Sequence, residues 1–227
     1  MPPRDRVHVI AIDGPAASGK STTARMVAAA LGFRQADSGA LYRAATAARI
    51  RRGGGPDAWT EASVLDAAGS VTVVPDEGVF GVRIDGAGAD AELRGAPVTA
   101  NVSLVARMPR VRAWVNARMR ECAGVGPIVV DGRDMGTAVF PDALLKIWLV
   151  ADTTERARRR SVELLGRMPT DEELARETAD LASRDARDAR QTAPAPDAVL
   201  VDTTRLTQAE QADRIVALAR ARLQTAR

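Results

Sequence analysis

Short apolar runs separated by amphipathic stretches form the dominant pattern of the chain. The runs are rich in Val, Ile and Leu and lack polar alternation, which is typical of strands buried on both faces of a parallel sheet. We place such strands at residues 7–12, 127–131, 144–150 and 199–201. Because helical patterns lie between them, the rhythm predicts an α/β fold built on a doubly wound parallel sheet of five strands.

Helical periodicity, capping residues and Gly or Pro breakers mark the stretches between the strands. We expect helices at about 21–31, 40–52, 58–68, 97–106, 109–123, 153–165, 170–189 and 207–223. Between residues 70 and 95 the rhythm is interrupted, because 70–74, 79–85 and 87–93 have the pattern of short strands joined by turns. This stretch predicts a small antiparallel insert within a single domain that spans residues 1–227.

The first strand leads into a glycine-rich loop with the spacing Gly14-x-x-x-x-Gly19-Lys20-Ser21, which a helix follows. Glycines leave the backbone N–H groups of such a loop open to an anion, and the helix directs its positive end at the same place. We expect Lys20 to reach the β- and γ-phosphates and the Ser21 hydroxyl to bind Mg²⁺. The loop therefore predicts binding of a nucleoside triphosphate, although the same spacing without a ligand is only a tight turn. The residues expected to contact the triphosphate are Gly14, Pro15, Ala16, Ala17, Ser18, Gly19, Lys20, Ser21 and Thr22.

The composition narrows the chemistry. The chain of 227 residues is 46% hydrophobic but only 3% aromatic, so its core must consist mainly of Ala, Val, Leu and Ile. A single cysteine, Cys122, rules out an internal disulfide. A single histidine, His8, argues against Ser–His–Asp and Cys–His mechanisms and against a histidine-rich metal site. The sequence has no leader-like segment and no apolar run of about 18 residues, so we expect a cytoplasmic protein without a membrane span.

The positive charge of the chain is carried almost entirely by arginine. Two of the 32 basic residues are lysines and the other 30 are arginines, and the formal net charge is +3. A basic chain raises nucleic-acid binding as a hypothesis. Most of the arginines lie beside acidic residues on helix faces, however, which is typical of solvated surfaces. A smaller set is suited to phosphate groups, because the guanidinium fork binds them bidentately.

Three further stretches indicate what happens to the triphosphate. Residues 37–43 place a hydroxyl and a guanidinium near the carboxyl edge of the sheet, and residues 131–136 follow a buried strand, where open α/β sheets bind ligands. The third stretch is a cationic cluster that consists of Arg156, Arg158, Arg159 and Arg160. The chain has no N-K-x-D segment for a regulatory GTPase and no room for the extra domains of mechanical ATPases. These features favour a kinase for a small acceptor, with a mobile cationic cover.

Six segments make the chain resemble the bacterial cytidylate kinases: IAIDGPAASGKST, DSGALYR, NVSLVARMPRVR, VVDGRDMGTAVFPDALLKIWL, RARRR and SRDARDAR. The resemblance runs from about residue 7 to residue 223, and GRDMGTxVFPDA is its most specific part. It implies transfer of the γ-phosphoryl group of ATP to CMP or dCMP with Mg²⁺, in pyrimidine nucleotide metabolism. It also implies a nucleoside monophosphate kinase fold, usually monomeric, with an acceptor-binding region at 38–126 and a lid at 153–190.

The functional positions of this family fall on a defined set of residues here. The resemblance implies catalysis by Lys20, Arg133, Arg156, Arg159 and Arg160, and reading of cytosine by Ser103, Arg112 and Asp134 with Ser38 beside them. It implies that Arg43, Arg133 and Arg190 hold the acceptor phosphate and that Arg184 and Asp188 meet the ribose. The assignment suits cytosine, which offers an amino donor at N4 and acceptors at N3 and O2. The arginines matched to Arg184 and Arg190 usually lie seven positions apart and here lie six apart, so Arg187 is an alternative to Arg190.

Two other functions stand as hypotheses. A phosphate-loop kinase for another nucleoside monophosphate or a small hydroxy acid would need different partners at Ser103, Arg112 and Asp134. A hydroxyl acceptor would also need a carboxylate base, such as Asp37 or Asp134. A nucleotide-gated nucleic-acid-binding protein would need a contiguous basic face, which the dispersed arginines do not suggest.

Overall fold

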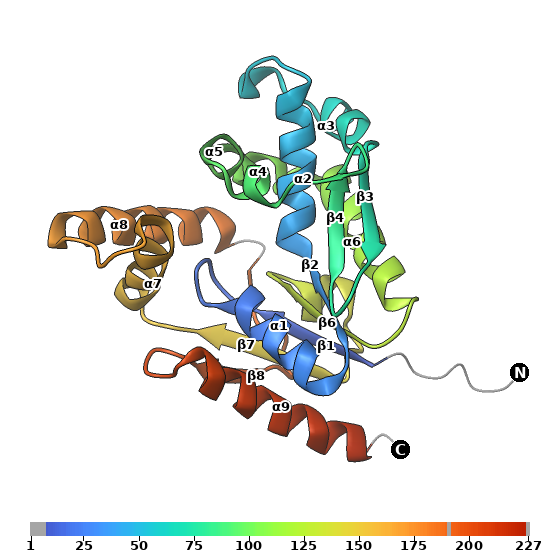
Figure 1. Cartoon of the computed structure of the whole chain (residues 1–227), viewed down its shortest axis with the longest axis vertical. Coiled ribbons are helices and arrows are strands. Elements are labelled where there is room, and N and C mark those ends of the chain that lie inside the picture. The colour runs from blue at the N-terminus through green and yellow to red at the C-terminus, as the bar shows by residue number, and fades with distance from the viewer. Residues whose placement is uncertain (1–7, 190–191, 226–227) are drawn as a thin grey trace, which may run out of the picture. The chain divides into compact units, whose positions relative to one another are not determined.

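Five parallel strands form the main sheet of the computed structural model, which describes residues 8–189 and 192–225 (Figure 1). In sheet order the strands are β2 (Arg34–Asp37), β6 (Ile128–Gly132), β1 (Val9–Asp13), β7 (Leu145–Val150) and β8 (Val199–Asp202). Sheet neighbours such as β1 and β7 are far apart in the chain, so their connections cross over the sheet. The predicted doubly wound α/β fold is confirmed.

The two faces of β1 and β7 have different roles. The strands pair in register from Ile10–Leu145 to Asp13–Trp148. Ile12 and its partner Ile147 belong to a buried apolar core that also includes residues of α1 (Lys20–Leu31) and α9 (Gln208–Thr225). Side chains alternate along a strand, so the next pair, Asp13 and Trp148, lies on the opposite face. One face of the sheet thus provides the core, and the other presents polar groups at the carboxyl ends of the strands.

The strand β2 is the one that the apolar pattern did not reveal. Its sequence, RQAD, contains a single apolar residue, and the strand lies at the edge of the sheet. Asp37 ends β2 and caps the next helix by accepting a hydrogen bond from the Ala40 N–H at 3.1 Å, as its turn predicted. That helix, α2 (Ser38–Arg51), begins two residues earlier than expected. The first strand, β1, begins at Val9, two residues after the expected start at Val7. Val7 itself lies outside the described residues.

Contacts within the chain divide it into two compact units, one of residues 34–128 and the other of residues 8–33 and 129–225. The helices of the first unit are α2, α3 (Glu61–Ala68), α4 (Asp90–Arg94), α5 (Ala96–Val105) and α6 (Pro109–Ala123), with a short 3₁₀ turn at Pro56–Ala58. In this unit α2 packs against α3, α5 and α6. The expected helix at 58–68 starts later than predicted because Thr60 and Ser63 form a capping box at its N-terminus.

The antiparallel insert predicted in the first unit is present. Its strands are β3 (Val71–Pro75), β4 (Phe80–Ile84) and β5 (Ala87–Gly88), and they form a separate three-stranded sheet. The prediction of a third strand at 87–93 is wrong beyond residues 87 and 88, where β5 ends. The sequence Asp90-Ala-Glu-Leu-Arg94 forms the helix α4 instead, because it consists mainly of good helix formers with acids in the first turn.

The second unit carries two consecutive helices, α7 (Thr153–Leu165) and α8 (Asp171–Asp188), which pack against each other. Asp152 caps α7 by accepting from the N–H groups of Thr154 and Glu155. Thr170 and Glu173 form the capping box at the start of α8. The sequence predicted both helices nearly to the residue, because their caps are encoded locally. Among the described helices, none is long and apolar enough to cross a membrane.

Candidate active site

The loop between β1 and α1 has the backbone of an anion cradle. Gly14 has φ of +151°, and a Cβ at this position would collide with the carbonyl oxygen of Leu149. Gly19 has φ of +86° and stands at the N-cap of α1, where it offers no capping side chain. Lys20 is 6% exposed, and its Nζ donates to the Pro15 carbonyl oxygen at 2.6 Å and to Ser18 Oγ at 3.3 Å. The loop thus holds an ammonium group beside a helix N-terminus, which suits a polyphosphate.

A hydroxyl and a carboxylate meet at the end of this loop. Ser21 Oγ donates to Asp131 Oδ2 at 2.5 Å, and Asp131 lies near the carboxyl end of β6 with 2% of its surface exposed. Both side chains offer oxygen ligands, which Mg²⁺ prefers over nitrogen and sulfur. The pair is therefore chemically suited to Mg²⁺, with phosphate and water oxygens as the other ligands.

A second buried carboxylate, that of Asp13, lies at the end of β1. Its Oδ1 accepts from the Met135 N–H at 2.9 Å, and its Oδ2 accepts from the Gly136 N–H at 2.8 Å. Burial raises the pKa of Asp13, the two N–H donors lower it, and the nearby charges of Asp134 and Lys20 act in opposite directions. Asp13 thereby joins β1 to the single π-helical turn η2 (Met135–Val139), which follows Asp134.

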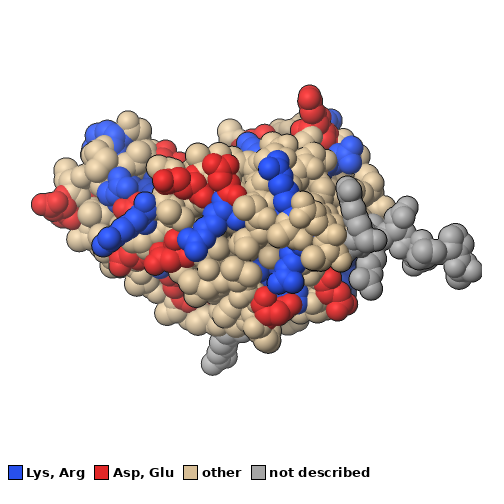
Figure 2. All heavy atoms as spheres, turned by 90° about the horizontal axis from the view of Figure 1, so that it is seen from below, with Lys and Arg blue, Asp and Glu red and all other residues tan. Residues whose placement is uncertain are grey.

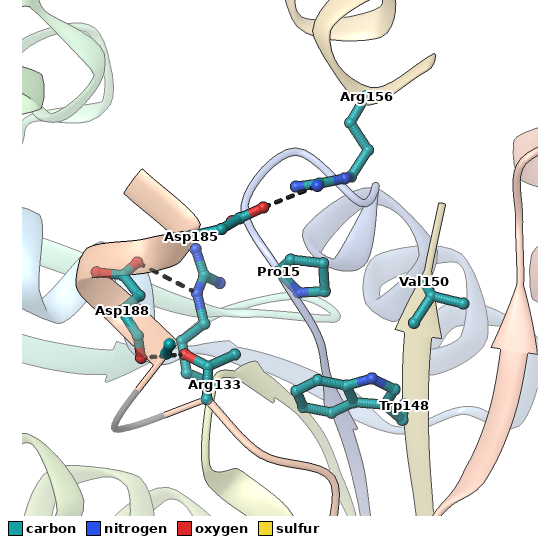
Figure 3. Close-up of a pocket in the computed structure, with 9 residues that line it drawn as sticks. Pro15, Arg133, Trp148, Val150, Arg156, Asp185 and Asp188 are labelled. Carbon is teal, nitrogen blue, oxygen red and sulfur yellow. Dashed lines mark hydrogen bonds and ion pairs between the residues drawn. The ribbon is translucent and has the colours of Figure 1, made fainter. Parts of the chain in front are cut away.

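A pocket of about 230 Å³ adjoins the phosphate loop (Figure 3). It is lined by Pro15 of the loop, Arg133 after β6, Trp148 and Val150 of β7, Arg156 of α7, Asp185 and Asp188 of α8, and Ala189 and Thr192 after α8. All of these residues belong to the second unit. Figure 3 shows Arg156 and Arg133 approaching the pocket from different elements, with Asp185 of α8 between them and Asp188 beside Arg133.

The two arginines of the pocket are each paired with a carboxylate of α8. Arg156, which is 4% exposed, places Nη2 at 2.7 Å from Asp185 Oδ2, and its Nη1 donates to the Ala16 carbonyl oxygen at 2.9 Å. Arg133 places Nε at 3.8 Å from Asp188 Oδ2. A phosphate group resembles a carboxylate in charge and in its acceptor oxygens. The pocket is therefore built to hold an anion between cations from two elements.

The outer surface carries mixed charge. On the face shown in Figure 2, Lys and Arg side chains lie among Asp and Glu side chains rather than in one broad basic area. Several arginines on or next to α7 and α8 form local ion pairs, among them Arg158 with Glu155, Arg167 with Glu173 and Arg176 with Glu172. This agrees with the interpretation that most arginines solvate helix faces.

Comparison with known proteins decides the family. A family model described as cytidylate kinase matches residues 10–221. The cytidylate kinase of Geobacillus thermodenitrificans is 43% identical over 226 residues, which cover 96% of this chain and 99% of that protein. The one of Thermus thermophilus is 46% identical over 200 residues, which cover 88% and 92%, and the one of Chromobacterium violaceum is 43% identical over 215 residues, which cover 92% and 94%.

This chain belongs to the cytidylate kinase family.

The acceptor-side residues that this family resemblance implied are distributed over both units. Ser38 and Arg43 lie on α2, Ser103 on α5 and Arg112 on α6, all in the first unit. Ser38 is buried, while the other three side chains are partly exposed. Arg43 Nη1 donates to Thr99 Oγ1 and to the Leu93 carbonyl oxygen, both at 3.0 Å, which directs it toward α4 and α5. The first unit thus holds these four residues on three helices, of which α2 packs against the other two.

The remaining acceptor-side residues belong to the second unit. Arg133 and Asp188 line the pocket, and Arg184 Nε lies 3.9 Å from the same Asp188 carboxylate. Asp134 is buried, with 7% of its surface exposed, and directly precedes η2. Arg190 lies outside the described residues, and the alternative, Arg187, is exposed on the last turn of α8.

The three arginines expected to act from the lid point to different places. Only Arg156 lines the pocket. Arg159 donates to Glu155 and to the carbonyl oxygens of Thr203 and Thr204, which follow β8. Arg160 pairs with Glu177 of α8 at 2.8 Å. A helix presents successive residues about 100° apart, so one arginine-rich turn does not direct all its side chains to one site.

The sequence patterns gave no role to four residues at this site: Asp13, Asp131, Trp148 and Asp185. Asp13 and Asp131 end buried apolar strands, and a carboxylate at such a place was the available signal. Asp185 follows Leu181 by four positions, and Leu181 is the buried residue of α8, so helical spacing placed both on one face. Trp148 lies in an apolar run that gave no sign of which side chains face a pocket.

Proposed function

We propose that this protein transfers the γ-phosphoryl group of ATP to CMP or dCMP, which yields ADP and CDP or dCDP. Membership of the cytidylate kinase family supports this activity. The observation that carries it at the level of the site is the pocket beside the phosphate loop, in which Arg133 and Arg156 face carboxylates that a phosphate group can replace.

The phosphate loop binds and orients the donor in this proposal. The Lys20 ammonium exchanges its contacts with Pro15 and Ser18 for phosphate oxygens, and the N-terminus of α1 adds its positive potential. Ser21 and Asp131 are the residues that would hold Mg²⁺. When bound, the ion neutralises negative charge on the phosphate oxygens.

The acceptor needs no general base. Its attacking atom is a phosphate oxygen, and with a second pKa of about 6 the phosphate is already ionised at neutral pH. Catalysis then consists of positioning and of stabilising charge in the transition state. We propose that Arg43, Arg133 and Arg190 bind the acceptor phosphate. Arg156 neutralises charge on the transferred phosphoryl group.

We assign the reading of the base to Ser103 and Arg112 of the first unit and Asp134 of the second. A carboxylate accepts from the N4 amino group of cytosine, and an arginine donates to O2 and N3. Uracil presents a carbonyl oxygen where cytosine has its amino group, so with UMP an acceptor would face the Asp134 carboxylate. Two acceptors that face each other without water are unfavourable, so the site should discriminate strongly against UMP in favour of CMP.

The experiment is a coupled assay of ADP formation against CMP, dCMP, UMP, AMP and GMP. We expect turnover with CMP and dCMP, and a kcat/KM for UMP lower by on the order of 10²-fold or more. A higher kcat/KM for another nucleoside monophosphate would favour the alternative of a kinase for a different acceptor. No ADP formation together with RNA binding that weakens steeply with salt would favour the nucleic-acid-binding alternative.

The role of Asp134 is tested with Asp134→Ala in the same assay. The substitution should reduce the CMP-to-UMP ratio mainly by lowering kcat/KM for CMP, while the KM for ATP stays nearly unchanged. Equal ratios in the two proteins would show that Asp134 does not read the base.

A further inference from the structure

Asp13 is the last residue of β1 and directly precedes the phosphate loop. It is 5% exposed. Its two carboxylate oxygens accept from two successive backbone N–H groups, those of Met135 and Gly136. Asp13 therefore contacts the turn η2 with both oxygens rather than with one.

Burying a carboxylate is unfavourable unless its charge is compensated by donors or by opposite charge. Burial is the largest influence on Asp13 and raises its pKa, while the Met135 and Gly136 N–H groups and the charge of Lys20 oppose it. An apolar residue would fill a strand end at no such cost, but it would leave two buried N–H groups without acceptors. The Asp13 carboxylate thus stabilises the turn η2 through these two hydrogen bonds and adds no apolar contact to the core.

The turn also lies against a second side chain, that of Lys146. A Cβ on Gly136 would lie 3.2 Å from Lys146 Cγ and Cδ and 3.4 Å from Asp13 Oδ2, so the backbone of Gly136 lies close against both side chains. Lys146 is itself fixed, because its Nζ lies 2.9 Å from Asp197 Oδ1 and only 8% of its surface is exposed. The backbone that follows Asp134 therefore lies close against both Asp13 and Lys146.

The position of this turn matters because Arg133 and Asp134 immediately precede it. Asp134 has φ of −144° and ψ of 25°, outside the regular helix and strand values, and its carbonyl oxygen accepts from the Ala138 N–H at 2.8 Å. Fixing the next two N–H groups fixes the Asp134–Met135 and Met135–Gly136 peptide planes, and the first of them ends at the Cα of Asp134, the residue directly after Arg133. A shift of the turn would move both side chains together.

We propose that Asp13 is a positioning residue for acceptor recognition: by holding the Met135 and Gly136 N–H groups, it places Arg133 and Asp134 relative to the phosphate loop. The proposal rests on the function proposed above. Asp13 touches no reacting atom in it and acts only through the turn.

The first test measures hydrogen exchange in the protein without nucleotides, and so does not depend on the proposed activity. Asp13→Asn keeps the volume and one acceptor oxygen but places an amide NH₂ against an N–H donor. We expect the Met135 and Gly136 amides to exchange at least about tenfold faster than in the wild type, because loss of one buried hydrogen bond shifts a local equilibrium by about that factor. Unchanged exchange at both amides would overturn the proposal.

The second test measures kinetics with CMP, UMP and ATP. Asp13→Asn should raise the KM for CMP and lower the CMP-to-UMP ratio of kcat/KM by about tenfold, with a KM for ATP within about threefold of wild type. Gly136→Ala displaces the same turn without removing a charge and should change the ratio in the same direction. An unchanged ratio in both variants would overturn the positioning role.

The matched control is Ile215→Ala, which removes a fully buried side chain from the core around α9. It should lower the thermal midpoint without changing the CMP-to-UMP ratio or the exchange of the Met135 and Gly136 amides. An equal change of the ratio in Ile215→Ala would mean that the Asp13 effect reports stability alone. If the wild type fails to phosphorylate CMP, the proposed function fails, and the exchange experiment still decides whether Asp13 holds the turn.

Discussion

At the scale of single residues, the site depends on a few buried charges. Lys20, Asp13, Asp131, Asp134 and Arg156 are each less than 9% exposed. Such groups are tolerated only where hydrogen bonds and opposite charges compensate the loss of water. Each is therefore fixed in place before a substrate binds, which is the condition for electrostatic catalysis.

Lys20→Ala tests the most central of these charges. The ammonium donates to Pro15 and Ser18 of the loop and is placed to meet phosphate groups, so its removal should lower kcat/KM by about 10³-fold or more and change the thermal midpoint little. The measurement is steady-state kinetics with CMP and ATP together with a thermal melt. Activity within about tenfold of wild type, which corresponds to about 1.4 kcal/mol, would contradict the assignment of the phosphate loop.

At the scale of elements, α7 shows how one helix separates similar residues by role. Arg156 is directed into the pocket, Arg158 and Arg159 share Glu155, and Arg160 pairs with Glu177. Asp185 on α8 meets Arg156 because α7 and α8 pack against each other. The proposed lid therefore carries one arginine in the pocket, while Arg159 and Arg160 join α7 to its neighbours.

Arg156→Lys tests this separation, with Arg158→Lys as the matched control on the same helix. A lysine cannot reproduce the fork that contacts Ala16, Ala151 and Asp185, so kcat should fall by about tenfold to a hundredfold, with a smaller change in the KM for CMP. Arg158→Lys should retain wild-type kinetics, since Arg158 pairs with Glu155 at the surface. If both variants lose activity equally, charge on α7 in general, and not the pocket position, determines the rate.

The start of α8 gives a pH-dependent prediction. The Arg167 guanidinium and the Thr170 N–H lower the pKa of Glu173 from its ordinary value of 4.5 to about 2. Between these two pKa values the folded state binds fewer protons than the unfolded state. The pair of Arg167 and Glu173 therefore stabilises the folded state above pH 4.5, and this stabilisation is lost as the pH falls toward 2. Glu173→Gln should have a lower thermal midpoint than wild type at pH 7, and the difference should be smaller at pH 3. A difference that grows on acidification would contradict this assignment.

At the scale of the whole molecule, each unit has its own buried interior. The second unit is organised around the sheet strands β1 and β7 with α1 and α9, and the first around α2 with the helices that pack on it. In the first unit Cys122 lies on the buried side of α6, where burial raises the pKa of the thiol to about 11. The reactivity of the Cys122 thiol therefore measures how often α6 separates from the helices that bury it.

Thiol labelling measures that state. At pH 8 the thiolate share of Cys122 should fall from about a tenth, for a thiol of ordinary pKa, to about a thousandth in the folded chain, because only the thiolate reacts. Labelling by an aromatic disulfide reagent should thus be at least about 100-fold slower in buffer than in concentrated urea. Comparable rates in the two conditions would show that α6 opens readily.

The sequence by itself determined the parts that depend on neighbouring residues. The phosphate loop, the buried strands β1, β6 and β7, and the capped helices α7 and α8 all follow from spacing, apolar runs and local caps. The antiparallel insert also followed, because its turns are encoded by short Gly and Asp signals. The family resemblance added the acceptor-side residues, which remain a proposal.

Only the tertiary structure decided which distant side chains meet. The pairing of Ser21 with Asp131 spans 110 positions, that of Asp13 with the Met135 and Gly136 N–H groups more than 120, and no local pattern encodes either. β2 was hidden because an edge strand of mostly polar residues takes its pairing from the sheet and not from its own hydrophobicity. That Arg156 lines the pocket while Arg159 and Arg160 contact other groups likewise depends on helix rotation and on α8, because electrostatic partners are set by proximity in space.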